Sequence, residues 1–220
     1  MESWREYIDT LTAGMERLEA TTADGAVLSA ADAFARWVEM THAADVAGQS
    51  IYIVGNGGSA STASHMAADL SRAALETDGL PLNCRCLSDS MAIVSAWGND
   101  VGFDSVFERQ LTQLVEPGDV LVAISASGNS PNILAAVELA RERGAYVLGF
   151  SGFGGGLLAK MADVAVVVES SEYGPVEDLH LLLNHLLAAV MRRLDQRRVE
   201  EQEEAVEEEE PAFAAAAAGL

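Results

Sequence analysis

Two short segments of the sequence are rich in residues that can bind a phosphate group. The first is Gly55-Asn56-Gly57-Gly58-Ser59, and the second is Ser125-Ala126-Ser127-Gly128-Asn129-Ser130. Glycine lets the backbone approach a ligand closely, while serine hydroxyls and free N–H groups at a helix start donate hydrogen bonds to phosphate oxygens. The second segment holds more donors than a turn requires, so we predict that it forms a phosphate site. The first segment, taken alone, fits an ordinary strand-to-helix turn equally well.

Four ionisable residues form a second group of candidates. His65 and Asp69 are four residues apart, so they share one face if this stretch is a helix. Such a pair can bind a metal ion or act as an acid–base couple, although an ordinary surface pair has the same spacing. Glu177 and His185 are separated by roughly 12 Å along a helix axis that rises about 1.5 Å per residue. One ion can contact both only if the helix is bent or frayed at Glu177, or if different subunits contribute. We expect His180 to be structural.

Alternating strands and helices must position these candidates. Short apolar runs at 51–54, 120–124, 146–150 and 164–168 predict strands, residues 82–87 predict a further strand, and segments of helical periodicity separate them. Five strands with intervening helices predict an α/β fold with a five-stranded, doubly wound parallel sheet. Ligands of such sheets bind beyond the carboxyl ends of the strands, where both glycine- and serine-rich segments are expected.

The sequence divides into three predicted parts. Residues 1–48 predict two helices, separated by a break near Asp24-Gly25, that pack on the domain and at an oligomer interface. Residues 49–197 predict the α/β domain, whose last helix ends near Arg193. Residues 198–220 are Glu-rich and then Ala-rich, which predicts an acidic, disordered tail.

Composition limits the classes of partner. The formal net charge is −21, which argues against nucleic acid or an acidic membrane surface as a partner. Cys84 and Cys86 are too close along one strand for an unstrained disulfide, and two free thiols fit a reducing cytoplasm. We see no signal peptide and no apolar run that could span a bilayer, so we expect a cytoplasmic protein.

Taken together, these motifs resemble a known family. The two loops, the segment Gly98-Asn99-Asp100-Val101-Gly102-Phe103 and the segment from Glu177 to His185 are similar to the phosphoheptose isomerase branch of the sugar isomerase (SIS) domain family. The resemblance covers about residues 30–195. It implies a flavodoxin-like SIS fold, a homotetramer with active sites at subunit interfaces, and aldose–ketose isomerisation of a sugar phosphate. Sedoheptulose 7-phosphate is the substrate that it favours, with an enediol intermediate.

The resemblance also implies roles for individual residues. The family's histidine, glutamate, glutamine and histidine fall on His65, Asp69, Glu177 and His185, and all four can bind Zn²⁺. The glutamate and the last histidine are implied as catalytic base and acid. Asp100 matches a substrate-contacting aspartate, although Gly98-Asn99-Asp100 also has the composition of a turn. The residues implied in substrate binding are therefore Asn56, Gly57, Gly58, Ser59, Asp100, Ser125, Ala126, Ser127, Asn129 and Ser130.

Four positions depart from the family pattern. Asp69 is one methylene shorter than the expected glutamate, and Glu177 adds a charge where glutamine is expected. Ala126 replaces a hydroxyl residue, and Gly174 replaces an aspartate. Catalytic geometry is sensitive at about the 1 Å level, so the base is either Asp69, repositioned, or Glu177, which can also serve as a metal ligand. The alternative is a non-catalytic phosphosugar-binding or partner-binding module.

Overall fold

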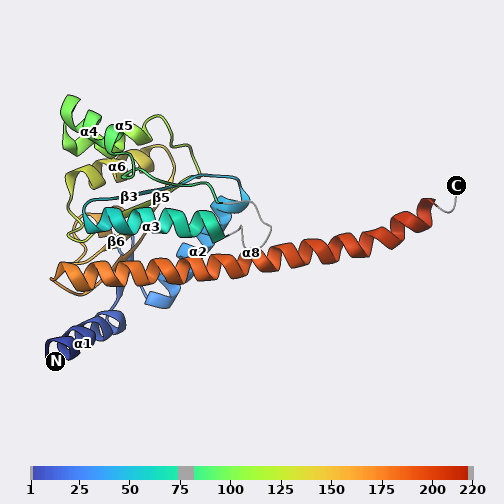
Figure 1. Ribbon diagram of the computed structural model, residues 1–220, viewed down its shortest axis with the longest axis horizontal. Coiled ribbons are helices and arrows are strands. Elements are labelled where there is room, and N and C mark those ends of the chain that lie inside the picture. Colours follow the sequence, from blue (N-terminus) through green and yellow to red (C-terminus); the bar gives the residue numbers. More distant parts are fainter. Residues whose placement is uncertain (1, 74–81, 218–220) are drawn as a thin grey trace.

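A computed structural model describes residues 2–73 and 82–217 (Figure 1). The strands in this part of the chain form one sheet in the order β2-β1-β7-β6-β5-β3-β4. The strands are β1 (Glu19–Thr22), β2 (Val27–Leu28), β3 (Ile51–Gly55), β4 (Cys84–Cys86), β5 (Val120–Ser125), β6 (Tyr146–Ser151) and β7 (Val164–Val167). The helices are α1 (Glu2–Glu16), α2 (Ala30–Val46), α3 (Gly58–Ala73), α4 (Met91–Asp100), α5 (Val106–Leu111), α6 (Pro131–Glu142), α7 (Leu158–Met161) and α8 (Tyr173–Ala217), with a 3-10 turn, η2 (Phe103–Ser105), before α5.

The centre of the sheet is parallel. Strands β3 to β7 lie in the order β4-β3-β5-β6-β7, and each neighbouring pair is parallel. This is the flavodoxin-like order, in which the strand order reverses between β3 and β5. The predicted five-stranded, doubly wound parallel sheet is therefore confirmed for this part of the molecule.

Helices cover both faces of the sheet, and each face has its own core. Side chains of α2, α3 and α8 pack with Ile51 and Ile53 on one face. Side chains of α5, α6 and α7 pack with Tyr52 and Val54 on the other. Every residue of β3, β5 and β7 is buried, because successive side chains point into opposite cores. Burial on both faces accounts for the continuous apolar runs in the sequence.

The prediction that residues 1–48 form only helices is wrong. Between α1 and α2 the chain forms a hairpin, in which β1 pairs antiparallel with β2 and also with β7. The sheet of the described chain therefore has two more strands than predicted. These strands are short and lie at one edge of the sheet. Thr22 on β1 is buried although its side chain is polar, so the sequence does not mark it as a core residue. We expected Gly25 to separate two helices. It lies instead in the turn of the hairpin, with φ of 82°.

The last helix is longer than predicted. We expected it to end near Arg193 and the chain from residue 198 to lack structure, but α8 continues to Ala217 and its C-terminal part runs clear of the sheet in Figure 1. Glutamate and alanine have high helix propensity, so the composition that predicts disorder also favours a helical backbone. Residues 218–220 lie outside the described part of the chain. None of the described helices combines the length and apolar character needed to cross a membrane.

Candidate active site

The two predicted phosphate loops meet at the carboxyl edge of the sheet. One follows β3 and the other follows β5, which are parallel neighbours at the point where the strand order reverses. Asn56 and Asn132 join the loops through two reciprocal amide hydrogen bonds, each 2.9 Å long. Asn132 is buried, and we did not predict it. A polar side chain directly after the proline that starts α6 was the available signal, but its partner is 76 positions away.

A cavity of about 290 Å³ lies between the loops. Eight of the predicted substrate-binding residues form part of its wall: Asn56, Gly57, Gly58, Ser59, Ser125, Ala126, Ser127 and Ser130. Ile124, Tyr173 and Glu177 complete the wall. The cavity therefore combines backbone N–H groups, hydroxyls and one carboxylate in a small space.

The serine-rich loop has a fixed shape. Gly128 has φ of 65°, and a Cβ there would collide with the backbone oxygen of Gly155. Asn129, which is predicted to bind substrate, does not line the cavity; its amide donates to the carbonyl oxygen of Ser127 and its carbonyl accepts from the N–H of Leu157. We infer that Asn129 secures the loop.

The hydroxyls of the loop are available to a ligand. Ser130 is the residue before α6 but makes no side-chain capping bond to the helix. Its Oγ lies 3.1 Å from the Oγ of Ser125, which is buried in the cavity wall. At the start of α6, Pro131 has no N–H and the N–H groups of Ile133 and Leu134 both donate to the carbonyl oxygen of Ser130. The helix therefore favours an anion mainly through the positive end of its dipole. This arrangement suits a phosphate group.

Glu177 lies in the cavity and not beside the histidines. A Cβ on Gly58 would collide with the Glu177 carboxylate, so the carboxyl group lies directly over the start of α3. The N-terminal end of a helix favours a negative charge at that position. Within one chain, Glu177 and His185 could share an ion only if the helix were bent or frayed at Glu177. This condition is not met, because α8 is helical from Tyr173. Within one chain, the residues that gather are His65, Asp69 and His185, and a contribution of Glu177 to the predicted four-residue metal set would need a second subunit.

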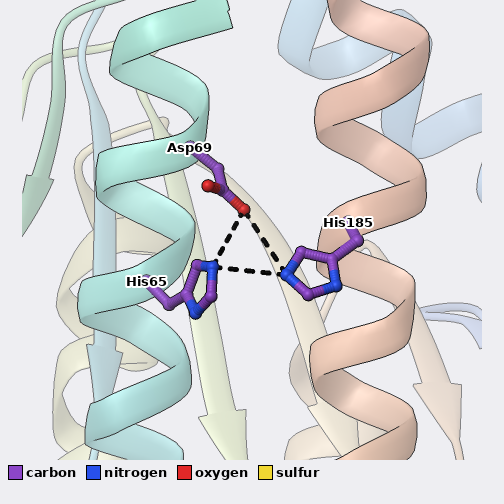
Figure 2. Close-up of side chains that lie close together, drawn as sticks. All are labelled: His65, Asp69 and His185. Atoms are coloured by element: carbon purple, nitrogen blue, oxygen red, sulfur yellow. Dashed lines mark hydrogen bonds and ion pairs between the residues drawn. The ribbon is translucent and has the colours of Figure 1, made fainter.

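His65, Asp69 and His185 come together between two helices (Figure 2). The Nε2 atom of His65 lies 3.4 Å from Oδ2 of Asp69 and 3.2 Å from Nε2 of His185. The distance from His185 Nε2 to Asp69 Oδ2 is 3.8 Å. His65 and Asp69 share one face of α3, as predicted, and His185 faces them from α8.

The donor atoms of this cluster are of the kinds that bind zinc. Two imidazole nitrogens and a carboxylate oxygen are common Zn²⁺ ligands, and three protein ligands leave one coordination position open. One ligand atom from each residue lies within 4.8 Å of the others. The side chains of His65 and His185 are about half exposed, so an ion or a substrate can reach them from solvent.

Three further residues lie outside both groups. Asp100 is exposed at the end of α4, accepts a hydrogen bond from Asn99 and does not line the cavity of its own chain. Next to Gly174, where the resemblance led us to expect an aspartate, lies the hydroxyl of Tyr7. His180 is fully buried with Nε2 3.1 Å from the carbonyl oxygen of Ser151, and burial lowers its pKa to about 4. Its neutral, buried ring fits the structural role that we expected.

The two cysteines are not candidates for a nucleophile. Both are free, and they lie on β4 at the edge of the sheet. Burial raises the pKa of the Cys84 thiol to about 12 and that of the Cys86 thiol to about 11. Since the thiolate is the reactive form, both side chains are inert at neutral pH.

Comparison with known proteins gives a consistent set of relatives. Residues 6–152 match the model of the SIS domain. The phosphoheptose isomerase of Rhodospirillum rubrum is 42% identical over 145 residues, which cover 66% of this chain and 77% of that protein. The phosphoheptose isomerase of Geobacter sulfurreducens is 36% identical over 184 residues, or 83% of this chain and 94% of that protein.

Solved structures agree with the sequence relatives. The phosphoheptose isomerase of Neisseria gonorrhoeae superposes with a TM-score of 0.74 at 30% identity, covering 86% of this chain and 95% of that chain. A phosphoheptose isomerase of Francisella tularensis gives a TM-score of 0.76 at 26% identity, covering 87% and 95%. The similarity therefore extends over nearly the whole length of both solved chains.

Proposed function

The chain belongs to the SIS domain family, and on that premise we propose that it is a phosphoheptose isomerase, which interconverts sedoheptulose 7-phosphate and the corresponding aldose phosphate. One observation carries the proposal. The cavity lined by serines and backbone N–H groups adjoins the starts of α3 and α8, and the cluster of His65, Asp69 and His185 lies further along the same two helices. A phosphate site and a group of acid–base side chains are thus held by one pair of helices.

The phosphate anchors the substrate at the end that does not react. Ser125, Ser127 and Ser130 donate hydrogen bonds to its oxygens, and the positive end of the α6 dipole favours its charge. Charged acceptors strengthen such bonds. Binding energy from this remote end holds the sugar carbon atoms in position for reaction.

Isomerisation moves a proton between C1 and C2 through an enediol, which requires one base and one acid. We assign the base to Asp69 and the acid to His185, because their side chains face each other across α3 and α8. Glu177, in the cavity wall, is placed to accept hydrogen bonds from sugar hydroxyls. It is also the alternative base, since its carboxylate lies closer to the phosphate loops than the cluster does along α8.

We also propose Zn²⁺ as the cofactor. His65, Asp69 and His185 are the residues that would hold it, because their donor atoms are of the right type and gathered between α3 and α8. Held by these residues, the ion would act as a Lewis acid toward the sugar carbonyl.

The proposed assembly is a homotetramer with shared active sites. Helix α4 buries none of its residues in the described chain, and Met91 is 72% exposed although the helix is apolar. Leu182 and Leu186 on α8 are also exposed. Apolar surface of this kind usually marks an interface. A neighbouring subunit that contacts α4 would bring Asp100 into its site; light scattering that gives a monomer would contradict the proposal.

We also propose a cytoplasmic location. Two cysteines without a disulfide are consistent with a reducing compartment.

The test of function is direct: purified protein is incubated with sedoheptulose 7-phosphate, with and without Zn²⁺, and aldose phosphate is quantified. Turnover supports the isomerase. Tight binding of the sugar phosphate without turnover would instead indicate the non-catalytic binding module.

A further inference from the structure

A buried asparagine contacts the carboxylate of Asp69. Asn184, on α8, is completely buried, and its amide Nδ2 donates a 3.0 Å hydrogen bond to Oδ2 of Asp69 on α3. The accepting oxygen is the one that faces Nε2 of His65 at 3.4 Å and Nε2 of His185 at 3.8 Å. Asn184 therefore approaches the cluster from the core side, while the two histidines lie on the exposed side.

Packing alone does not explain why an amide side chain occupies position 184. Its neighbours Leu183 and Leu187 belong to the apolar core between α8, α3 and the sheet. The Asn184 carbonyl oxygen, Oδ1, has no hydrogen-bond partner among the described residues. A buried polar atom without a partner costs stability, so an apolar side chain of similar size would serve packing better. The hydrogen bond that its Nδ2 donates to Asp69 accounts for the amide.

We propose that Asn184 is a positioning residue that fixes the carboxylate of Asp69. An aspartate can rotate about two side-chain bonds, and only some of the resulting orientations point Oδ2 at the histidines. The hydrogen bond from Asn184, which is itself held by the packed core, selects one of them. Groups behind a ligand or a catalytic carboxylate commonly act in this way and set its orientation. The role assigned to Asp69 as base or ligand rests on the proposed function; the hydrogen bond does not.

Two substitutions separate the effect of losing the N–H donor from the effect of changing the side-chain volume. Asn184→Asp keeps the shape of the side chain but removes the N–H donor, and Asn184→Leu removes both polar atoms. Each is expected to lower kcat about 10- to 100-fold with KM changed less than about threefold, and to weaken Zn²⁺ binding, measured by calorimetry, by a similar factor. The melting temperature of Asn184→Leu should equal or exceed that of the unsubstituted protein, because the unpartnered carbonyl is removed as well.

Thr41→Val is the matched control. Thr41 is also buried with an unpartnered polar atom, but it lies on α2. Its substitution should leave kcat, KM and Zn²⁺ affinity unchanged. The proposal is overturned if Asn184→Asp and Asn184→Leu, both folded, retain kcat and Zn²⁺ affinity within about twofold.

A double-mutant cycle keeps the test independent of catalysis. The unfolding equilibrium of Asp69→Ala, Asn184→Leu and the double variant is measured by denaturant titration. One hydrogen bond predicts a coupling of about three- to tenfold in the unfolding constant. If the unsubstituted protein lacks isomerase activity, the proposed function fails while this coupling still supports the positioning contact. Coupling below about 1.5-fold overturns the contact whatever the activity.

Discussion

The serine-rich loop after β5 and the histidine cluster between α3 and α8 are built in opposite ways. The loop holds its hydroxyls within six consecutive residues, and the strand before it and the helix after it fix their positions. The cluster needs two helices whose contributing residues, His65 and His185, are 120 positions apart. A site contained in one turn can be identified from the sequence, whereas a site made by packing two helices depends on the whole fold.

The largest effect is expected from the cluster. Asp69→Asn removes the proposed base and should lower kcat about 10²- to 10⁴-fold, because that is the usual contribution of general acid–base catalysis. KM should change little, since the phosphate contacts are intact. Steady-state kinetics with sedoheptulose 7-phosphate measure both constants. Asp32→Asn, the same substitution on α2, is the control and should have no effect.

The opposite result would reassign the base. If Asp69→Asn keeps most of the turnover and Glu177→Gln loses it, the base is the carboxylate in the cavity and the cluster serves only as a metal site. The loop and the base would then belong to one continuous cavity, and the separation between the two regions would disappear.

Removing metal should affect the cluster and leave the loop intact. Dialysis against a chelator is expected to lower kcat about 10²- to 10³-fold, which corresponds to several kcal/mol of Lewis-acid stabilisation, and added Zn²⁺ should restore it. Inorganic phosphate should still inhibit the residual activity with an unchanged constant. Full activity with no metal detected by elemental analysis would remove zinc from the mechanism.

The difference between the two regions also explains what the sequence could predict. Strands β3, β5 and β7 were identifiable because burial on both faces makes them apolar throughout. The hairpin was missed because β1 and β2 are short edge strands of mixed polarity.

Within the site, the sequence was informative only over short range. The serine-rich loop and the pair His65 and Asp69 are local, and both were predicted. The spacing argument correctly indicated that Glu177 cannot join His185 within one straight helix. Asn184 was missed because its partner, Asp69, is 115 positions away, and an asparagine next to His185 has no periodic pattern that marks it.

The loop should affect binding more than turnover. Ser125→Ala removes one hydroxyl that faces the proposed phosphate, and a hydrogen bond to a charged group contributes about 1.5–3 kcal/mol. KM should therefore rise about 10- to 100-fold with kcat nearly unchanged, as measured by initial rates over a range of substrate concentration. Ser50→Ala, just before β3 at the opposite edge of the sheet, is the control. A fall in kcat at constant KM would mean that the loop also contributes to the chemical step.

The backbone of the loop gives the last and smallest expected difference. Gly128→Ala places a side chain at φ of 65° and against the carbonyl oxygen of Gly155, while Gly25→Ala meets a similarly positive φ of 82° with no atom within 4 Å. Both variants carry the backbone strain, about 1–2 kcal/mol, but only Gly128→Ala adds the steric clash, typically about 1–3 kcal/mol. Chemical denaturation of the two variants measures the difference. If the two variants are equally stable, the loop adjusts freely, and the bound ligand rather than the fold holds its hydroxyls in place. The loop would then resemble the cluster, because each would need a second component, a ligand or a second helix, to complete it.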